Sequence, residues 1–103
     1  YVPDARGTGR SSLVTCSNQP SFDIDPKNTR IFEQCIDELS ANFSKVLPFY
    51  DTYNSARDLQ TLRLTISGKV AFYALSYGTF VMNAYLQQGG LADTVVLDGP
   101  VPP

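Results

Sequence analysis

An apolar segment of strand length runs directly into a segment of helix length, and a single serine separates the two. Residues 70–75 (VAFYAL) follow Gly68 and are rich in aromatic and branched side chains, which is typical of a buried strand. Residues 77–86 (YGTFVMNAYL) are long enough for a helix, and a pair of glycines soon after them is a helix stop signal. We therefore expect a strand, a tight turn at Ser76 and a helix.

Ser76 and its neighbours fit the pattern small-x-Ser-x-Gly, in which the small residues are Ala74 and Gly78. In this pattern the tight turn exposes the serine hydroxyl, and the small residues let the helix pass close to the strand. Ala74 stands where glycine is usual, so its methyl group should make the turn more crowded. Ser76 is therefore a candidate nucleophile. The alternative is an ordinary helix N-cap, whose side-chain oxygen accepts a backbone amide hydrogen bond.

The sequence contains no histidine. A serine nucleophile usually needs a histidine to accept its proton. A lysine can replace the histidine in principle, but Lys27, Lys45 and Lys69 belong to no motif that suggests this. Either Ser76 is not a nucleophile, or its proton acceptor lies on polypeptide outside these residues.

The length of 103 residues allows one domain at most, and the composition is that of a globular protein. Of these residues 43% are hydrophobic and 17% charged, which is typical of a folded chain. The net charge of -2 gives no electrostatic basis for binding nucleic acid. No run of 18 apolar residues occurs, so no membrane span is expected.

The remaining segments predict two helices before the strand at 70–75 and a second strand after the helix that follows it. The first helix should begin with Asp25 as N-cap and continue to about Phe43. The second should have Thr52 or Asn54 as its N-cap and continue to Ile66. Residues 94–97 form the second strand. This order predicts an α/β fold with parallel strands, and their continuously apolar sequences are typical of strands covered on both faces.

Cys16 and Cys35 are the only cysteines. A disulfide between them and a pair of buried free thiols are both compatible with the sequence. Two sulfurs without histidine make a zinc site improbable, so no metal is expected. The Gly7-x-Gly9 loop lacks the lysine of a P-loop and the third glycine of a dinucleotide site, so no cofactor is expected either. Asn42 begins an N-glycosylation pattern, Asn-Phe-Ser.

Several segments, taken in order, resemble one family and together extend over nearly the whole chain. They are Asp4-x-Arg6-Gly7-Thr8-Gly9-Arg10-Ser11-Ser12, Cys16 with Cys35, Tyr53-Asn54-Ser55-Ala56-Arg57-Asp58-Leu59-x-x-Leu62-Arg63, Ser76-Tyr77-Gly78-Thr79, and Val95-Val96-Leu97-Asp98-Gly99-x-Val101-x-Pro103. On these segments the chain resembles the α/β-hydrolase superfamily, and within it the secreted prolyl and tripeptidyl aminopeptidase-like serine peptidases.

The resemblance implies that Ser76 attacks a peptide or ester carbonyl and that the N–H of Tyr77 is one donor of the oxyanion hole, while Ala74 and Gly78 frame the nucleophile turn. In the family the acid and the histidine follow the nucleophile, beyond the counterpart of Pro103. Asp98, in the loop after the second strand, is by resemblance more typical of a structural residue than of the acid.

The resemblance also implies that residues 1–103 are a central segment of a catalytic domain, with an incomplete sheet, and that this segment alone is inactive. Its partners are then a peptide or ester substrate and the remainder of the parent hydrolase. The cysteine pair and Asn42 favour a secreted protein or one of the secretory pathway. Two other functions stay open: a non-catalytic scaffold that serves interactions, and an esterase or lipase of the same fold.

Overall fold

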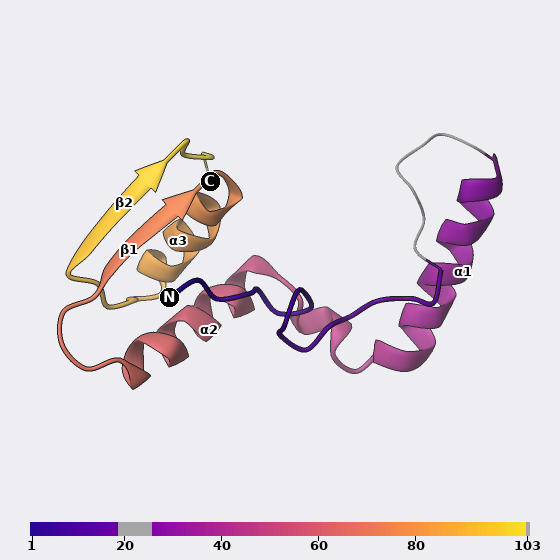
Figure 1. The fold of residues 1–103 in the computed structure, drawn as a ribbon, viewed down its shortest axis with the longest axis horizontal. Coiled ribbons are helices and arrows are strands. Elements are labelled where there is room, and N and C mark those ends of the chain that lie inside the picture. Colours follow the sequence, from indigo (N-terminus) through magenta and orange to yellow (C-terminus); the bar gives the residue numbers. More distant parts are fainter. Residues whose placement is uncertain (19–25, 103) are drawn as a thin grey trace. The chain divides into compact units, whose positions relative to one another are not determined.

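A computed structural model describes residues 1–18 and 26–102 of the chain. It divides into two compact units, Tyr1–Tyr50 and Asp51–Pro103, and each is described by itself. Figure 1 labels the helices and strands. They are, in order, α1 (Pro26–Phe43), the short 3-10 helix η1 (Leu47–Phe49), α2 (Thr52–Thr65), β1 (Ala71–Leu75), α3 (Tyr77–Gln87) and β2 (Thr94–Asp98). This is the predicted order, apart from η1; the expected cap Asp25 lies outside the described residues.

The first unit consists of α1, η1 and a loop that precedes them. A disulfide joins Cys16, which is buried, to Cys35 of α1. Of the two possibilities for this pair, a disulfide or two free thiols, the structure has the disulfide. The guanidinium of Arg6 donates to the carbonyl of Phe49 at 2.6 Å and joins the glycine-rich loop to η1. Phe32 and Ile36 of α1 are exposed despite their apolar side chains.

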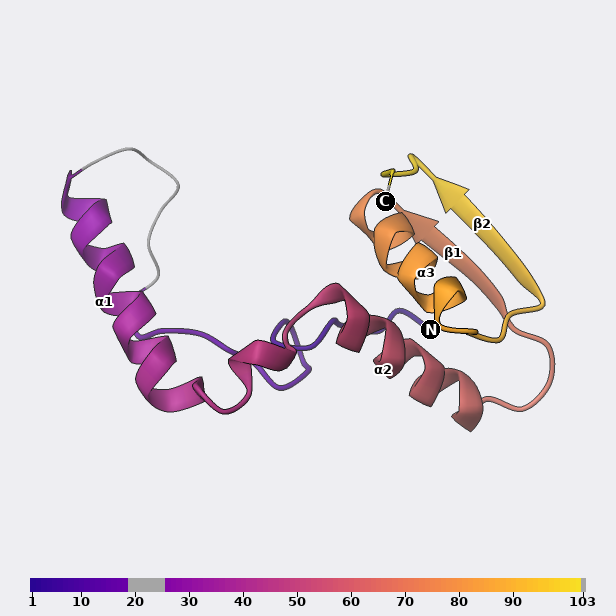
Figure 2. The same ribbon diagram turned by 180° about the vertical axis from the view of Figure 1, so that it is seen from behind.

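The second unit is a βαβ arrangement with α2 packed against it. β1 and β2 pair in parallel, from Ala71 beside Thr94 to Leu75 beside Asp98. α3 connects the two strands and contacts both β1 and α2, and Figures 1 and 2 show it lying along the sheet. Parallel strands need such a crossover, because a hairpin can join only antiparallel ones. The α/β class and the parallel pairing are as predicted.

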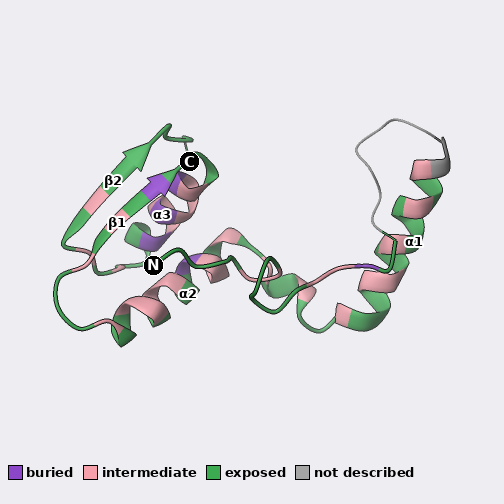
Figure 3. Ribbon diagram, in the orientation of Figure 1, coloured by how far each residue is buried: buried purple, intermediate pink, exposed green. Residues whose placement is uncertain are grey.

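The core of the second unit lies where β1, α2 and α3 meet. Its buried members are Ala56, Ala74, Met82 and Tyr85, which Figure 3 shows as purple segments of the ribbon. The rings of Phe72 and Tyr85 lie 5.2 Å apart at a tilted angle of 57°, a favourable aromatic geometry. Two alanines in this core let the helices and the strand approach closely.

Only one face of the two-stranded sheet is covered. Tyr73, Leu75 and Val96, on the opposite face, are 65%, 59% and 47% exposed. The expectation that both faces of these strands are covered is therefore wrong for the part of the chain that is described. The core residues of α2 and α3 pack with Phe72 and Ala74, on one face of the sheet. An apolar face of this kind is typical of a surface that another segment covers.

α2 begins one residue earlier than its sequence suggests. Its N-cap is Asp51, whose carboxylate accepts the backbone N–H of Asn54 at 2.7 Å; neither Thr52 nor Asn54 is the cap. The backbone of Asp51 is extended (φ −129°, ψ 171°), as an N-cap requires. A carboxylate is also favoured at the positive end of the helix, so aspartate is the better cap of the three.

Candidate active site

Ser76 lies in a strained turn at the junction of β1 and α3. Its backbone has φ 49° and ψ −122°, and it is the only non-glycine residue with positive φ among those described. These angles are near those of the first central residue of a type II′ turn, a position that usually requires glycine. A serine with such angles costs about 1–3 kcal/mol and persists only where the surrounding structure holds it.

Hydrogen bonds to both backbone groups of Ser76 hold this turn. Its N–H donates to the carbonyl of Asp98 at 2.9 Å, at the end of the parallel ladder where Asp98 pairs with Leu75. Its carbonyl accepts the N–H of Thr79 at 2.9 Å and the hydroxyl of Thr79 at 2.6 Å. The strand pairing and the first turn of α3 therefore fix the turn from two sides.

The hydroxyl of Ser76 is not used as a helix cap. Ser76 occupies the N-cap position of α3, but its side chain makes no capping hydrogen bond, and the residue is exposed. The alternative that it is an ordinary capping serine is therefore wrong. An exposed hydroxyl in a strained turn between a strand and a helix is the local geometry of a nucleophile elbow.

The small residues around Ser76 leave enough room for this geometry. A Cβ placed on Gly78 would lie 4.0 Å from the Cβ of Ala74, which is ordinary van der Waals contact. The extra methyl group of Ala74, expected to crowd the turn, is accommodated without a close approach.

Tyr77 is the first residue of α3. Its N–H is among the first amides of the helix, which have no acceptor within the helix, and it lies at the positive end of the helix dipole. Its exposed ring stacks on Phe80, with the ring centres 6.2 Å apart, and its hydroxyl lies 2.9 Å from the hydroxyl of Thr52. A backbone N–H at the start of a helix can donate a hydrogen bond to an anion.

Asp98, the last residue of β2, is already engaged in two hydrogen bonds. Its carbonyl accepts the N–H of Ser76, and its carboxylate accepts the hydroxyl of Tyr73. This side-chain hydrogen bond raises the pKa of Tyr73, because ionised Tyr73 would no longer donate to the carboxylate and would face a like charge. Both bonds join the two strands, in agreement with a structural role.

Thr79 is a residue of this site that the sequence did not reveal. It has an exposed fraction of 0% and is the only buried polar side chain in the described part of the chain. A threonine three residues after the turn residue, in the first turn of a helix, is a typical position for a side chain that bonds to the backbone. That spacing was visible in the sequence, but the partner of its oxygen, the N–H of Val101, lies 22 residues away.

Two predicted features of the first unit, the disulfide and Asn42, lie on or beside α1. The disulfide lies next to Glu38, whose carboxylate accepts the N–H of Ser17 at 3.0 Å and its hydroxyl at 2.8 Å. These bonds, that of the backbone above all, lower the pKa of Glu38. These hydrogen bonds lie at the surface of the unit, so Glu38 joins α1 to Ser17 on a solvent-exposed face. Asn42 is exposed near the end of α1.

In the glycine-rich loop around Gly7 and Gly9, the carboxylate of Asp4 binds the loop's own backbone. Asp4 accepts the N–H of Arg10 at 2.9 Å, and the guanidinium of Arg10 lies 3.6 Å from the same oxygen. A Cβ on Gly9 would lie 2.5 Å from the carboxyl carbon of Asp4. An acidic group in this position repels phosphate, so the loop is not a phosphate cradle.

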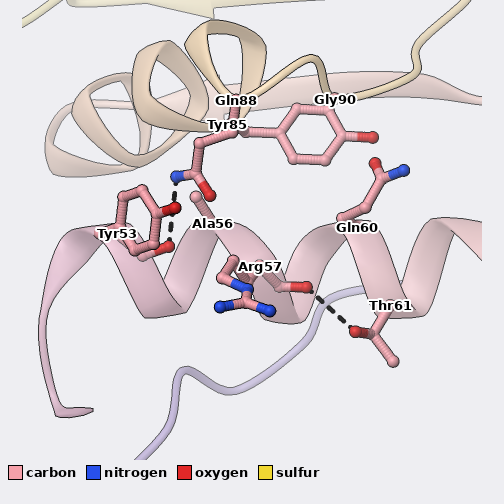
Figure 4. Close-up of a pocket in the computed structure, with 8 residues that line it drawn as sticks. All are labelled: Tyr53, Ala56, Arg57, Gln60, Thr61, Tyr85, Gln88 and Gly90. Atoms are coloured by element: carbon pink, nitrogen blue, oxygen red, sulfur yellow. Dashed lines mark hydrogen bonds between the residues drawn. The ribbon is translucent and has the colours of Figure 1, made fainter.

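A groove of about 480 Å³ lies between α2 and the end of α3, away from Ser76. Figure 4 shows its lining, which comprises Tyr53, Ala56, Arg57, Gln60, Thr61, Tyr85, Gln88 and Gly90. Gln88 donates to the carbonyl of Tyr53 and Gln60 accepts the N–H of Leu91, so both amides bind the fold itself. The groove contains no residue of the Ser76 turn and lies at the opposite end of α3.

Within residues 1–18 and 26–102, no three metal-binding side chains gather, and no helix is long and apolar enough to cross a membrane. Comparison with protein-family models, with curated proteins and with solved structures found no match for this chain.

Proposed function

We propose that this chain carries the nucleophile of a serine hydrolase, an aminopeptidase-type peptidase of the α/β-hydrolase superfamily. The observation that carries the proposal is the turn at Ser76. Its exposed hydroxyl makes no capping bond, and its backbone is held at φ 49° by hydrogen bonds from β2 and α3. An ordinary serine between a strand and a helix needs neither the strain nor the exposure.

The reaction proceeds through an acyl-enzyme. The Oγ of Ser76 attacks the carbonyl carbon of the substrate and loses its proton to a base. The resulting oxyanion accepts the N–H of Tyr77, and one such preorganised donor lowers a barrier by about 3 to 4 kcal/mol. The C–N bond then breaks, the leaving amine takes the proton, and water hydrolyses the ester on Ser76.

The base belongs to polypeptide outside these residues, because the sequence contains no histidine. The resemblance places the acid there as well. The same polypeptide would complete the sheet of a hydrolase fold, in which residues 1–103 are the central segment. The exposed apolar face with Tyr73, Leu75 and Val96 supports this part of the proposal. Two parallel strands with free edges are also seldom stable without further strands or a cover.

We also propose that the protein follows the secretory pathway. The disulfide between Cys16 and Cys35 and the exposed position of Asn42 support this. Mass spectrometry of the protein from its natural source tests it: reduction should add two hydrogen atoms for this cystine, and Asn42 should carry a glycan. Two free thiols and an unmodified Asn42 would contradict it.

Hydrolysis by variants of the full-length protein tests the catalytic proposal. Ser76→Ala should abolish hydrolysis of peptide and ester substrates, while Ser67→Ala, at an exposed serine of the same unit, should leave it unchanged. Full activity of Ser76→Ala with correct folding would overturn the assignment. Parallel assays with aminoacyl amides and simple esters separate a peptidase from an esterase or lipase.

A non-catalytic scaffold is the second candidate, and the absence of histidine favours it. The same turn and the same exposed hydroxyl would then be a remnant of the fold. This function predicts that the intact protein hydrolyses neither substrate class and that the exposed sheet face binds another protein.

A further inference from the structure

The hydroxyl of Thr79 connects three segments around the turn at Ser76. It donates to the carbonyl of Ser76 at 2.6 Å and accepts the N–H of Val101 at 2.9 Å. The side chain is fully buried, with an exposed fraction of 0%. Removing this oxygen would therefore leave the N–H of Val101 without its partner and the carbonyl of Ser76 with one donor fewer.

The bond from Val101 determines which way the hydroxyl of Thr79 points. A hydroxyl has one proton and two lone pairs. Because the N–H of Val101 occupies a lone pair, the single proton remains for the carbonyl of Ser76. That carbonyl then receives two donors from the same residue, the hydroxyl and the backbone N–H of Thr79.

Fixing the carbonyl of Ser76 also fixes the N–H of Tyr77. The two groups belong to the same peptide unit, which is planar, and in a trans peptide they point in opposite directions. No cis peptide occurs among the described residues. Because the carbonyl of Ser76 points toward its two donors on Thr79, the N–H of Tyr77 is directed away from Thr79.

We propose that Thr79 is a positioning residue that aims the N–H of Tyr77 at the oxyanion of the reaction. This inference rests on the proposed role of Ser76 and adds a residue that does not touch the substrate. Without its hydroxyl the peptide unit between Ser76 and Tyr77 can rotate, and the donor is less well aligned when charge develops. The loss should therefore appear in kcat more than in KM.

The test compares Thr79→Val, which removes the hydroxyl at nearly constant volume, with Thr79→Ser, which retains it. In the full-length protein, kcat of Thr79→Val should fall by about 10- to 100-fold, less than for complete loss of an oxyanion donor, with KM little changed. Thr79→Ser should remain close to the wild type. Binding of a peptide aldehyde, which forms a tetrahedral oxyanion, should weaken in parallel with kcat/KM in Thr79→Val. Binding of a peptide product should not.

Equal kcat values for Thr79→Val and Thr79→Ser would overturn the positioning role, and so would equal losses of aldehyde and product binding. If Thr79→Val does not fold, Val101→Pro is the second test, because it removes the N–H that orients the hydroxyl and leaves Thr79 itself unchanged. An unchanged kcat in Val101→Pro would then overturn the inference, and a reduced kcat with unchanged product binding supports it. Activity in Ser76→Ala is a different outcome, which would overturn the proposed function itself.

Discussion

The N–H of Ser76 donates to the carbonyl of Asp98 at 2.9 Å, so the last residue of β2 holds the turn that follows β1. The hydrogen bonding of the two strands thus reaches the candidate site, and it holds the backbone of Ser76 in place. The strain at Ser76 and the bonds that hold it have measurable consequences.

Glycine at position 76 should make the protein more stable than alanine at the same position, by about 1 kcal/mol or more, because only glycine adopts this φ without strain. Thermal unfolding of Ser76→Gly and Ser76→Ala measures the difference. At the exposed helical position Thr61 of α2, the same pair of substitutions should give the opposite order. A more stable alanine variant at position 76 would contradict the strained geometry.

Gly90→Ala should destabilise the protein by about 1–3 kcal/mol, as overpacking does. The added Cβ would lie 2.4–2.5 Å from ring atoms of Tyr85, which is 1% exposed and hydrogen-bonded to the carbonyl of Leu91.

Gly78→Ala is the matched control for Gly90→Ala. Its Cβ meets only the Cβ of Ala74, at 4.0 Å, and alanine is the better helix former. Its denaturation midpoint should equal or exceed that of the wild type. Similar losses in both variants would show that these contacts are described wrongly.

Acid should weaken the attachment of Ser17 to α1. The hydrogen bonds from Ser17 lower the pKa of Glu38 below its ordinary 4.5 in the folded state. A lowered pKa contributes stability that is present above pH 4.5 and is lost as the pH falls through the folded-state value. As the pH falls through the folded-state pKa of Glu38, the backbone amide of Ser17 should therefore lose protection against hydrogen exchange, measured relative to its intrinsic exchange rate. Glu38→Gln should remove this pH dependence, and protection unaffected by the substitution would contradict the interaction.

Tyr73 should titrate above its ordinary pKa of 10.0, because its hydroxyl donates to Asp98. Because the pKa is raised, the hydrogen bond from Tyr73 to Asp98 contributes its full stability below pH 10.0, and this stability is lost as the pH rises through the folded-state pKa of Tyr73. NMR titration of ring-labelled tyrosine follows it. Asp98→Asn should bring the pKa of Tyr73 back toward 10.0, whereas Asp93→Asn should not; an equal effect of both would contradict the specific bond.

Local patterns in the sequence were enough to locate most of the second unit. The glycines at 68, 89 and 90 and the apolar run at 70–75 predicted β1 and α3 to within a residue or two, and the order of elements predicted the parallel pairing. The disulfide was one of two open possibilities, because spacing alone does not determine whether two thiols meet.

Contacts between distant residues were not predictable in this way. The position of Glu38 on its helix is local information, whereas its partner Ser17 lies 21 residues away in the sequence. Thr79 was overlooked for the same reason, since Val101 is 22 residues further along the chain. The exposed face of β1 and β2 shows the converse: continuous apolar sequence predicts that a strand is covered, but it does not say which segment covers it.

The most direct measurement is to identify the residue that a fluorophosphonate probe modifies in the full-length protein. We predict a single covalent adduct on the peptide that contains Ser76, blocked by prior binding of substrate and absent after denaturation. An adduct on another serine, or no adduct in a protein that hydrolyses peptides or esters, would contradict the assignment of Ser76 as the nucleophile.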